Sequence, residues 1–285
     1  MIRRLLTLPA ACAAVVALAS FDVAVPDGMV KIPGGTFEYG TDSADIPALV
    51  AKYHLSDPSI VSSEAPQRKV TMKPFYLDKG EVLVSDFVQF VAKDTAWLPH
   101  GDSARFSNGD YLRMWASGHI VAGSDSLPVT YVTWFSARAY CRAKNRRLPT
   151  EVEWEYAARG GLTGGDIYPW GDAPPDTARA NYGASDMAHP TRPGMYPANG
   201  YGLYDMAGNV WEFTADQWSD PRDPPRNEPV VSQPWSKDPS LDLLTRVVIR
   251  GGSYDAAPVN LRVRYRDSHP AGDAKPFVGF RCARS

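Results

Sequence analysis

The chain has few thiols and none of the common catalytic motifs. It contains three cysteines in 285 residues, and because Cys12 lies near the N-terminus, only Cys141 and Cys282 belong to the main part of the chain. No Cys-x-x-Cys pair, phosphate-binding Gly-rich loop, dinucleotide fingerprint, His-Glu-x-x-His motif or Gly-x-Ser-x-Gly elbow is present. These absences argue against the familiar nucleotide-dependent enzymes, zinc proteases and serine hydrolases.

An excess of charge is also missing. The formal net charge is -2, and charged residues are interspersed along the chain, so electrostatics gives no reason to expect a nucleic-acid partner. The hydrophobic fraction of 44% is enough for a substantial core. The 23 glycines and 25 prolines indicate many turns. We therefore predict one globular domain over residues 20–285.

The first 19 residues predict an export signal. Met1 to Arg4 form a basic start, residues 5–19 are an apolar run too short to span a bilayer comfortably, and Ala17-Leu18-Ala19 offers the small residues that signal peptidase recognises. We expect cleavage near Ala19 and a protein that does not span the membrane. General secretion and the twin-arginine route both remain open.

Three helices and two strands are predicted from residue patterns. Residues 84–93 place Phe87, Phe90 and Val91 on one face, with Ser85 as the expected cap. Residues 132–145 form a second apolar pattern with helical spacing. Thr150 and Glu153 form a capping box at the start of a third helix. Residues 246–250 and 260–266 are predicted strands.

Several longer motifs follow one another in a recognisable order. They are MVKIPGGTFEYG from Met29, LPVTYVTWFSARAYCRAKNRRLPTEVEWEYAARGG from Leu127, YPWG from Tyr168, NGYGLYDMAGNVWEF from Asn199, RGGSY from Arg250 and GFRCA from Gly279. In this order they resemble the formylglycine-generating enzymes, also called sulfatase-modifying factors. The resemblance implies an α+β fold of the C-type-lectin-like kind, with little regular secondary structure.

The chain departs from that family where the family does its chemistry. There, the RGGS-[YW] motif precedes a redox-active cysteine pair that binds copper(I) and activates oxygen. Here Asp255, Ala256, Ala257, Pro258, Val259, Asn260 and Leu261 fill this window. Without a thiolate, formylglycine generation is excluded and no copper is expected. The redox cofactor, if there is one, is unknown.

Four side chains near this window are candidate catalytic groups. Asp255 and Tyr254 stand where the resemblance places the first catalytic residues, and Asp267 or His269 would serve as a proton partner. The alternative is that Asp255 is a solvated turn residue.

Arginines and a tryptophan are candidate substrate-binding groups. Alternate residues of a strand share a face, so Arg262, Arg264 and Arg266 are expected on one side of strand 260–266. They would hold a substrate anion or, as structural ion pairs commonly do, the carboxylates of the scaffold. Trp97, Trp115 and Trp218 lie in less patterned segments and are candidates for ligand contact.

The resemblance also implies structural calcium. A first site would use the side chains of Asp205 and Glu212 with the carbonyls of Gly208 and Val210, and a second site would use Asn181, the carbonyl of Tyr182 and Asp186. Oxygen ligands of this kind suit calcium. The alternative is that these polar groups cap turns.

A disulfide between Cys141 and Cys282 is implied in the same way. Two cysteines in an exported chain are more commonly a disulfide than a metal or redox pair.

The function that the resemblance implies is oxidative. A cysteine-less, exported branch of the family acts in pyoverdine maturation. By this analogy we expect a periplasmic oxidoreductase that completes the chromophore of a peptide siderophore, with the siderophore precursor as its partner. The alternative from another class is a non-catalytic, lectin-like binding module for a peptide, a sugar or a partner protein.

Overall fold

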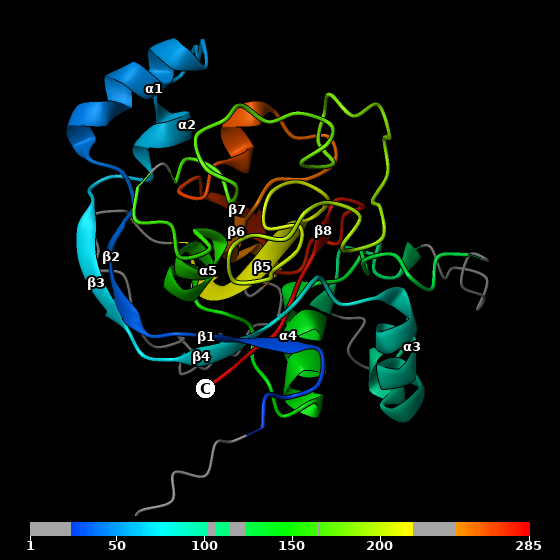
Figure 1. Cartoon of the computed structure of the whole chain (residues 1–285). Helices are drawn as coiled ribbons and strands as arrows, with labels where there is room; N and C mark the ends of the chain where they lie inside the picture. The colour runs from blue at the N-terminus through cyan, green and yellow to red at the C-terminus, as the bar shows by residue number, and fades with distance from the viewer. Residues whose placement is uncertain (1–23, 102–105, 114–122, 165, 219–242) are drawn as a thin grey trace, which may run out of the picture.

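The computed structural model describes residues 24–101, 106–113, 123–164, 166–218 and 243–285 (Figure 1). The predicted export signal and Trp115 lie outside these residues. The described part combines short helices with three small sheets and many loops, which places the fold in the α+β class predicted from the sequence. No helix in the described ranges has the length and apolarity needed to cross a membrane.

The largest sheet has four strands in the order β7-β6-β5-β8. They are β5 (Trp211–Gln217), β6 (Arg246–Arg250), β7 (Asp267–Pro270) and β8 (Val278–Gly279). β6 runs antiparallel to β5 and β7, whereas β8 runs parallel to β5. The register places Glu212 of β5 opposite Arg250 on one side and Gly279 on the other. The prediction of a strand at 246–250 is confirmed.

Two smaller sheets are built from four strands in the first third of the chain and one strand at the C-terminus. β1 (Met29–Ile32), β4 (Phe75–Asp78) and the C-terminal β9 (Ala283–Arg284) form one antiparallel sheet, and β2 (Gly35–Tyr39) pairs antiparallel with β3 (Arg68–Met72). α1 (Ile46–Lys52) and α2 (Ser59–Ser62) lie between β2 and β3 in the chain. The C-terminus is therefore anchored beside the first strands.

The three predicted helices are present. α3 (Val84–Lys93) has the predicted bounds, and α4 (Trp134–Ala143) is two residues shorter at each end than predicted. Ser85 does not cap α3, because the N-cap is Leu83 and the first amides donate instead to the carbonyls of Leu127 and Asp125. α5 (Glu151–Ala158) begins with the predicted capping box of Thr150 and Glu153.

α5 is buried along its whole length. It lies against β5 and β6 at the centre of Figure 1, with Trp154 fully buried. Glu151, Glu153 and Glu155 are buried as well. A buried carboxylate is costly unless it is paired, so the position of α5 requires cations around it.

The main core packs α3 and α4 against the large sheet, and it contains the disulfide. Cys141 of α4 is bonded to Cys282, with 5.7 Å between their Cα atoms, which confirms the predicted pairing. A third, small cluster contains Ala256 and Leu261 together with Tyr168 and Tyr182. Part of the window that replaces the cysteines is therefore ordinary core.

The predicted strand at 260–266 is wrong. Pro258–Leu261 form a short 3-10 helix, and the chain then turns before β7. Ala257 and Asn260 close the start of this helix through the hydrogen bond from the Ala257 amide to the Asn260 side chain. The three arginines that follow consequently do not share one face.

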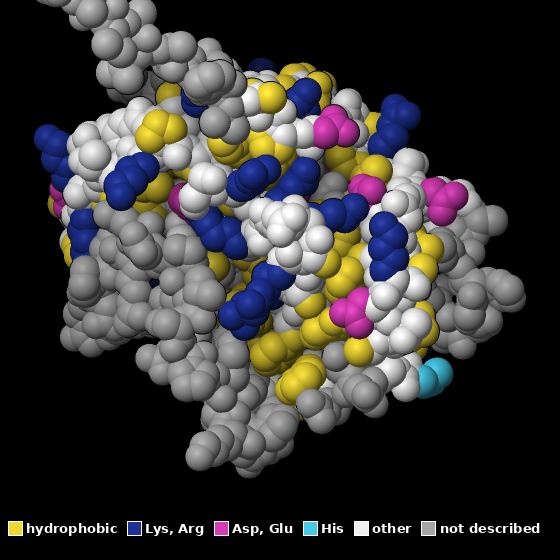
Figure 2. Space-filling model, turned by 90° about the horizontal axis from the view of Figure 1, so that it is seen from below, with side chains coloured by type: hydrophobic (Ala, Val, Ile, Leu, Met, Phe, Trp, Pro, Cys, Tyr) yellow, Lys and Arg dark blue, Asp and Glu magenta, His cyan; other side chains and the backbone are white. Residues whose placement is uncertain are grey.

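Charge is unevenly distributed over the surface. The face seen in Figure 2 carries mainly Lys and Arg among its charged side chains, set between apolar ones. The net charge of -2 therefore does not describe every face of the molecule.

Candidate functional site

The RGGS segment forms a tight turn after β6. Gly251 and Gly252 have φ angles of +96° and +79°, a region that residues with a Cβ rarely adopt. A Cβ on Gly252 would also lie 3.0 Å from a methyl carbon of Leu261. These two glycines bring the next residues, Ser253 to Ala256, back against the loop that carries Asn209.

Tyr254 and Asp255 are held at this turn. The Tyr254 amide donates to the Asn209 carbonyl at 2.9 Å, and the Ala256 amide donates to the Ser253 carbonyl at 2.9 Å. The fully buried Ser253 donates its hydroxyl to Oδ1 of Asp255, whose side chain is exposed. The turn thus presents a carboxylate to solvent at a fixed position.

The phenol of Tyr254 is half-buried beside this carboxylate. Burial raises its pKa above the usual value, and the charge of Asp255 and the neighbouring Tyr131 raise it further. Tyr254 therefore stays protonated at neutral pH and offers a hydrogen-bond donor beside the Asp255 carboxylate.

The other two predicted catalytic groups lie elsewhere. His269 is in β7, where its Nε2 is 2.9 Å from the Asp273 carbonyl and burial lowers its pKa. Asp267 is near the Tyr265 hydroxyl, at 3.5 Å, and accepts from the Ser268 amide. Among the described residues, no contact joins either side chain to Asp255. The structure brings together only Tyr254 and Asp255 of the four candidates.

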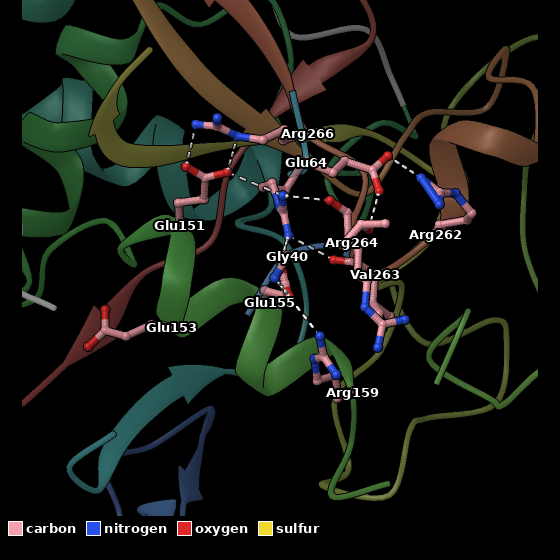
Figure 3. A network of polar contacts seen from close by, with 12 residues as sticks. Gly40, Glu64, Glu151, Glu153, Glu155, Arg159, Arg262, Val263, Arg264 and Arg266 are labelled. Carbon is pink, nitrogen blue, oxygen red and sulfur yellow. Dashed lines mark hydrogen bonds and ion pairs between the residues drawn. The ribbon is translucent and has the colours of Figure 1, made fainter. Parts of the chain in front are cut away.

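The three predicted substrate-binding arginines extend in different directions (Figure 3). Arg266 binds Glu151 through two hydrogen bonds of 2.7 and 2.8 Å, Arg262 pairs with Glu64, and Arg264 pairs with Asp166 at 2.8 Å. Arg262 and Arg266 are buried, and neither is available to a ligand while these pairs persist. They therefore serve the scaffold, which is the second of the two uses left open by the sequence.

The same network contains residues that the sequence analysis did not single out. Arg250 donates to Glu155 at 2.7 Å and to Glu151 at 3.2 Å, and Arg159 binds Glu155 and Asp166. Burial raises the pKa of Glu64, and Arg262 opposes this shift. The one signal in the sequence was the run of three glutamates in EVEWEYAA, but their partners follow only from the three-dimensional fold.

Trp218 contacts this network through Arg266. The guanidinium carbon of Arg266 lies 4.5 Å from the centroid of the half-buried Trp218 ring, in the geometry of a cation–π contact. This contact helps to fix Arg266, and it gives Trp218 a structural role.

The first predicted calcium site fits a cation only with a changed set of ligands. Both oxygens of Glu212 accept from Arg281, at 2.6 and 2.7 Å, and Oε2 also accepts from the indole of Trp154. Oε2 of the neighbouring buried Glu81 has no hydrogen-bond partner in the part of the chain that the structure describes. The buried carboxyl groups of Glu81 and Asp205 interact electrostatically with Glu212 and Arg281, and carboxylate oxygens are ligands that calcium selects.

Carboxylates alone would not complete that site. Within the described part of the chain, no three acidic, histidine or cysteine side chains converge as a metal cluster. A calcium ion bound by Asp205 and Glu81 would therefore need main-chain carbonyls, such as the predicted ones of Gly208 and Val210. Calcium at this place stays a prediction.

The second predicted calcium site is engaged in a turn. Asn181 accepts from the Ser185 hydroxyl at 2.8 Å and donates to the His189 carbonyl at 3.0 Å. The Tyr182 carbonyl accepts from the Ser185 amide at 2.8 Å, and Asp186 is exposed. These contacts hold the turn together, and calcium at this second site stays a prediction.

Comparison with known proteins identifies relatives that cover most of the chain. Inactive C-alpha-formylglycine-generating enzyme 2 of Bos taurus is 36% identical over 298 residues, which cover 90% of this chain and 87% of that protein. Hercynine oxygenase of Mycolicibacterium smegmatis is 33% identical over 277 residues, covering 89% of this chain and 60% of that protein. The structure of PvdO from Pseudomonas aeruginosa matches with a TM-score of 0.66 and 25% identity, covering 90% of this chain and 94% of that one.

The family model for the sulfatase-modifying factor enzyme 1-like domain matches residues 17–285. Together with the relatives above, which include an oxygenase, this match supports an oxidative role of the formylglycine-generating-enzyme type. The chain therefore belongs to the family of sulfatase-modifying factor enzyme 1-like domains.

Proposed function

We propose that this protein is an oxidase that completes the chromophore of a peptide siderophore in the periplasm, as in pyoverdine maturation. The similarity to PvdO over 90% of the chain and the relationship to an oxygenase support this proposal. Export rests on the predicted signal in residues 1–19.

The turn of Ser253, Tyr254 and Asp255 is the observation that carries the proposal. It stands where the family has its cysteines, and it holds an exposed carboxylate beside a protonated phenol. The hydrogen bond from the Ser253 hydroxyl holds the Asp255 carboxylate in place. A substrate ring bound at this turn would therefore meet a base in a constant position.

The reaction is a two-electron dehydrogenation. Asp255 takes a proton from the dihydro ring of the precursor, and Tyr254 donates a hydrogen bond to the electron-rich ring. The two electrons and the second proton pass to dioxygen, and the proton on Asp255 follows. The ring gains one double bond, and one dioxygen becomes one hydrogen peroxide.

Conversion of the dihydro precursor by purified protein in air tests this assignment. Asp255→Asn keeps the size of the side chain but cannot take up the proton, so the rate should fall by about 100- to 10,000-fold. Asp45→Asn, at another exposed aspartate, is the matched control and should keep full activity. Equal rates for Asp255→Asn and wild type would remove Asp255 from the mechanism.

A non-catalytic binding module is the second candidate. It is favoured by the separation of His269 and Asp267 from Asp255 and by the similarity to a relative that is named inactive. Wild-type protein that binds the precursor and never converts it would support this candidate over the first.

A further inference from the structure

A hollow in the surface lies away from the Tyr254 turn. It measures about 440 Å³ and is bounded by β2, the C-terminal half of α5, residues 161–164 and the side chains of Tyr201 and Arg264. None of the residues that line it belongs to the segment from Ser253 to Leu261. Whatever binds here does not depend on the chemistry of that turn.

One wall of the hollow is aromatic. The ring centroids of Phe37 and Tyr156 are 5.1 Å apart, and those of Tyr156 and Tyr201 are 6.2 Å apart, so the three rings form a row. Leu162 is 39% exposed at the same hollow. A flat apolar ligand would find ring contacts along this wall.

The other wall carries cations that share a carboxylate. Asp166 accepts from both Arg159 and Arg264, so two guanidinium groups are bound to one carboxylate. In Figure 3 the Arg264 side chain extends toward Arg159 and away from Arg262 and Arg266. Glu38 also lines the hollow, and its carbonyl, not its carboxylate, accepts from Arg159.

These guanidinium groups have unused hydrogen-bond donors. Nε of Arg159 and Nε of Arg264 are themselves buried and have no hydrogen-bond partner among the described residues. Nη1 of Arg264 has no partner among the described residues either, and 22% of the Arg264 side chain is exposed. Arg264 also lines a neighbouring hollow of about 300 Å³, so its side chain lies between the two hollows.

The ion pairs of the network also point to Arg264. Among the described residues, five arginines are paired with four carboxylates in this network, and the carboxylates are Glu64, Glu151, Glu155 and Asp166. Arg262 and Arg266 each have a carboxylate of their own or a bidentate bond, whereas Arg264 has one oxygen of a shared one. Of these arginines, Arg264 therefore has the least complete pairing with a carboxylate.

We propose that this hollow binds a planar aromatic carboxylate, with the ring against Phe37, Tyr156 and Tyr201 and the carboxylate on Arg264. Arginine suits this role because its planar fork matches a carboxylate. The same chemistry is found in a free aromatic acid and in a peptide that ends in an aromatic residue. The proposal goes beyond the oxidative function and does not require it.

Binding of 2-naphthoate, followed by titration calorimetry, tests the site against the neutral isostere 2-naphthamide. The acid should bind at least about tenfold more tightly, as a charge-assisted hydrogen bond predicts. Arg264→Gln should remove this preference, with its melting temperature measured in parallel because Asp166 loses a partner. Equal affinity of the two compounds for wild-type protein would overturn the proposal.

Two substitutions of opposite charge at the exposed Leu162 test the site and leave the arginine–carboxylate network unchanged. Leu162→Asp should weaken 2-naphthoate binding several-fold and Leu162→Lys should strengthen it, while 2-naphthamide responds to neither. Leu98→Asp and Leu98→Lys are the matched controls, because Leu98 is 37% exposed and does not line the hollow. Identical effects at both positions would contradict the assignment, since they would reflect net charge alone.

The source of the ligand follows from a third probe. N-acetyl-tryptophan carries the same ring-plus-carboxylate chemistry as a peptide C-terminus. Binding of N-acetyl-tryptophan that is sensitive to Arg264→Gln supports a peptide ligand, whereas binding of 2-naphthoate alone supports a free aromatic acid. Neither result depends on turnover of a siderophore precursor, so this proposal and the proposed function can fail separately.

Discussion

Arg281 binds Glu212 through both carboxylate oxygens, and neither side chain is exposed to solvent. The same arginine donates to the carbonyls of Tyr204, Asp78 and Lys79. It thereby ties the C-terminal segment to β5 and to the end of β4. Breaking a buried ion pair by removing one partner is strongly destabilising.

Glu212→Gln should therefore lower the free energy of unfolding by about 3 to 5 kcal/mol. Urea denaturation followed by circular dichroism measures this loss. Glu38→Gln, at an exposed glutamate of β2, should change it by less than about 0.5 kcal/mol. A loss below about 1 kcal/mol for Glu212→Gln would show that Arg281 finds other partners.

Calcium is expected to stabilise the fold through Asp205 and Glu81. A ligand bound only by the native state raises the melting temperature by mass action, so a chelator should lower that of wild type. The double variant Asp205→Ala with Glu81→Ala should have lost this sensitivity, whereas Asn181→Ala should retain it. A chelator effect that survives in the double variant would place the ion elsewhere.

The buried Asp216 predicts a specific dependence of stability on pH. Burial, followed by the charge of Glu151, raises the pKa of Asp216 from 3.8 to about 7. Between these values the folded protein keeps a proton that the unfolded chain releases. This contribution to stability is complete below pH 3.8 and declines by about 1.4 kcal/mol per pH unit until about pH 7.

Asp216→Asn cannot titrate, so its free energy of unfolding should fall less steeply over that window than that of wild type. The amide oxygen still offers an acceptor to the Glu151 amide, which now donates to Asp216 at 2.6 Å. Urea titrations at several pH values measure the slope, with Asp45→Asn as the control at an exposed site. A slope unchanged from wild type would show that Asp216 is ionised in the folded protein.

The disulfide, together with the proposed removal of the export signal that carries Cys12, predicts a protein with no reactive thiol. Cys141 and Cys282 are 141 positions apart, and on the chain-entropy account a loop of this size stabilises the fold by about 4 to 5 kcal/mol. Thiol titration of the denatured, unreduced protein should read near zero, and reduction should lower the melting temperature. Two reactive thiols before reduction would refute the bond in the purified protein.

Local elements were predictable where short-range rules decide them. The apolar spacing of Phe87, Phe90 and Val91 gave the bounds of α3, and the Thr150–Glu153 capping box gave the start of α5. The strand prediction for residues 260–266 was wrong. Their alternating arginines have the pattern of a strand, but their conformation is set by carboxylates far away in the chain. Glu64, for example, is 198 positions from its partner Arg262.

The candidate site was predictable in part for the same reason. The place of Tyr254 and Asp255 followed from the RGGS motif, whose glycines permit the turn. The separation of His269 from Asp255 did not, because it depends on β7 pairing with β6 in a register that directs His269 toward Asp273. The oxygen of Glu81 that has no partner among the described residues and the incomplete carboxylate pairing of Arg264 exist only in the folded packing.

Oxygen consumption during conversion of a dihydro-chromophore precursor is the direct test of the proposed oxidase activity. An oxygen electrode combined with a peroxide assay and mass spectrometry measures all three species in one sample of purified wild-type protein. We expect one dioxygen to be consumed and one hydrogen peroxide to form for each precursor that loses two hydrogens, with no conversion under nitrogen. Tight binding of the precursor without oxygen uptake, whether or not copper, iron or flavin is added, would contradict it.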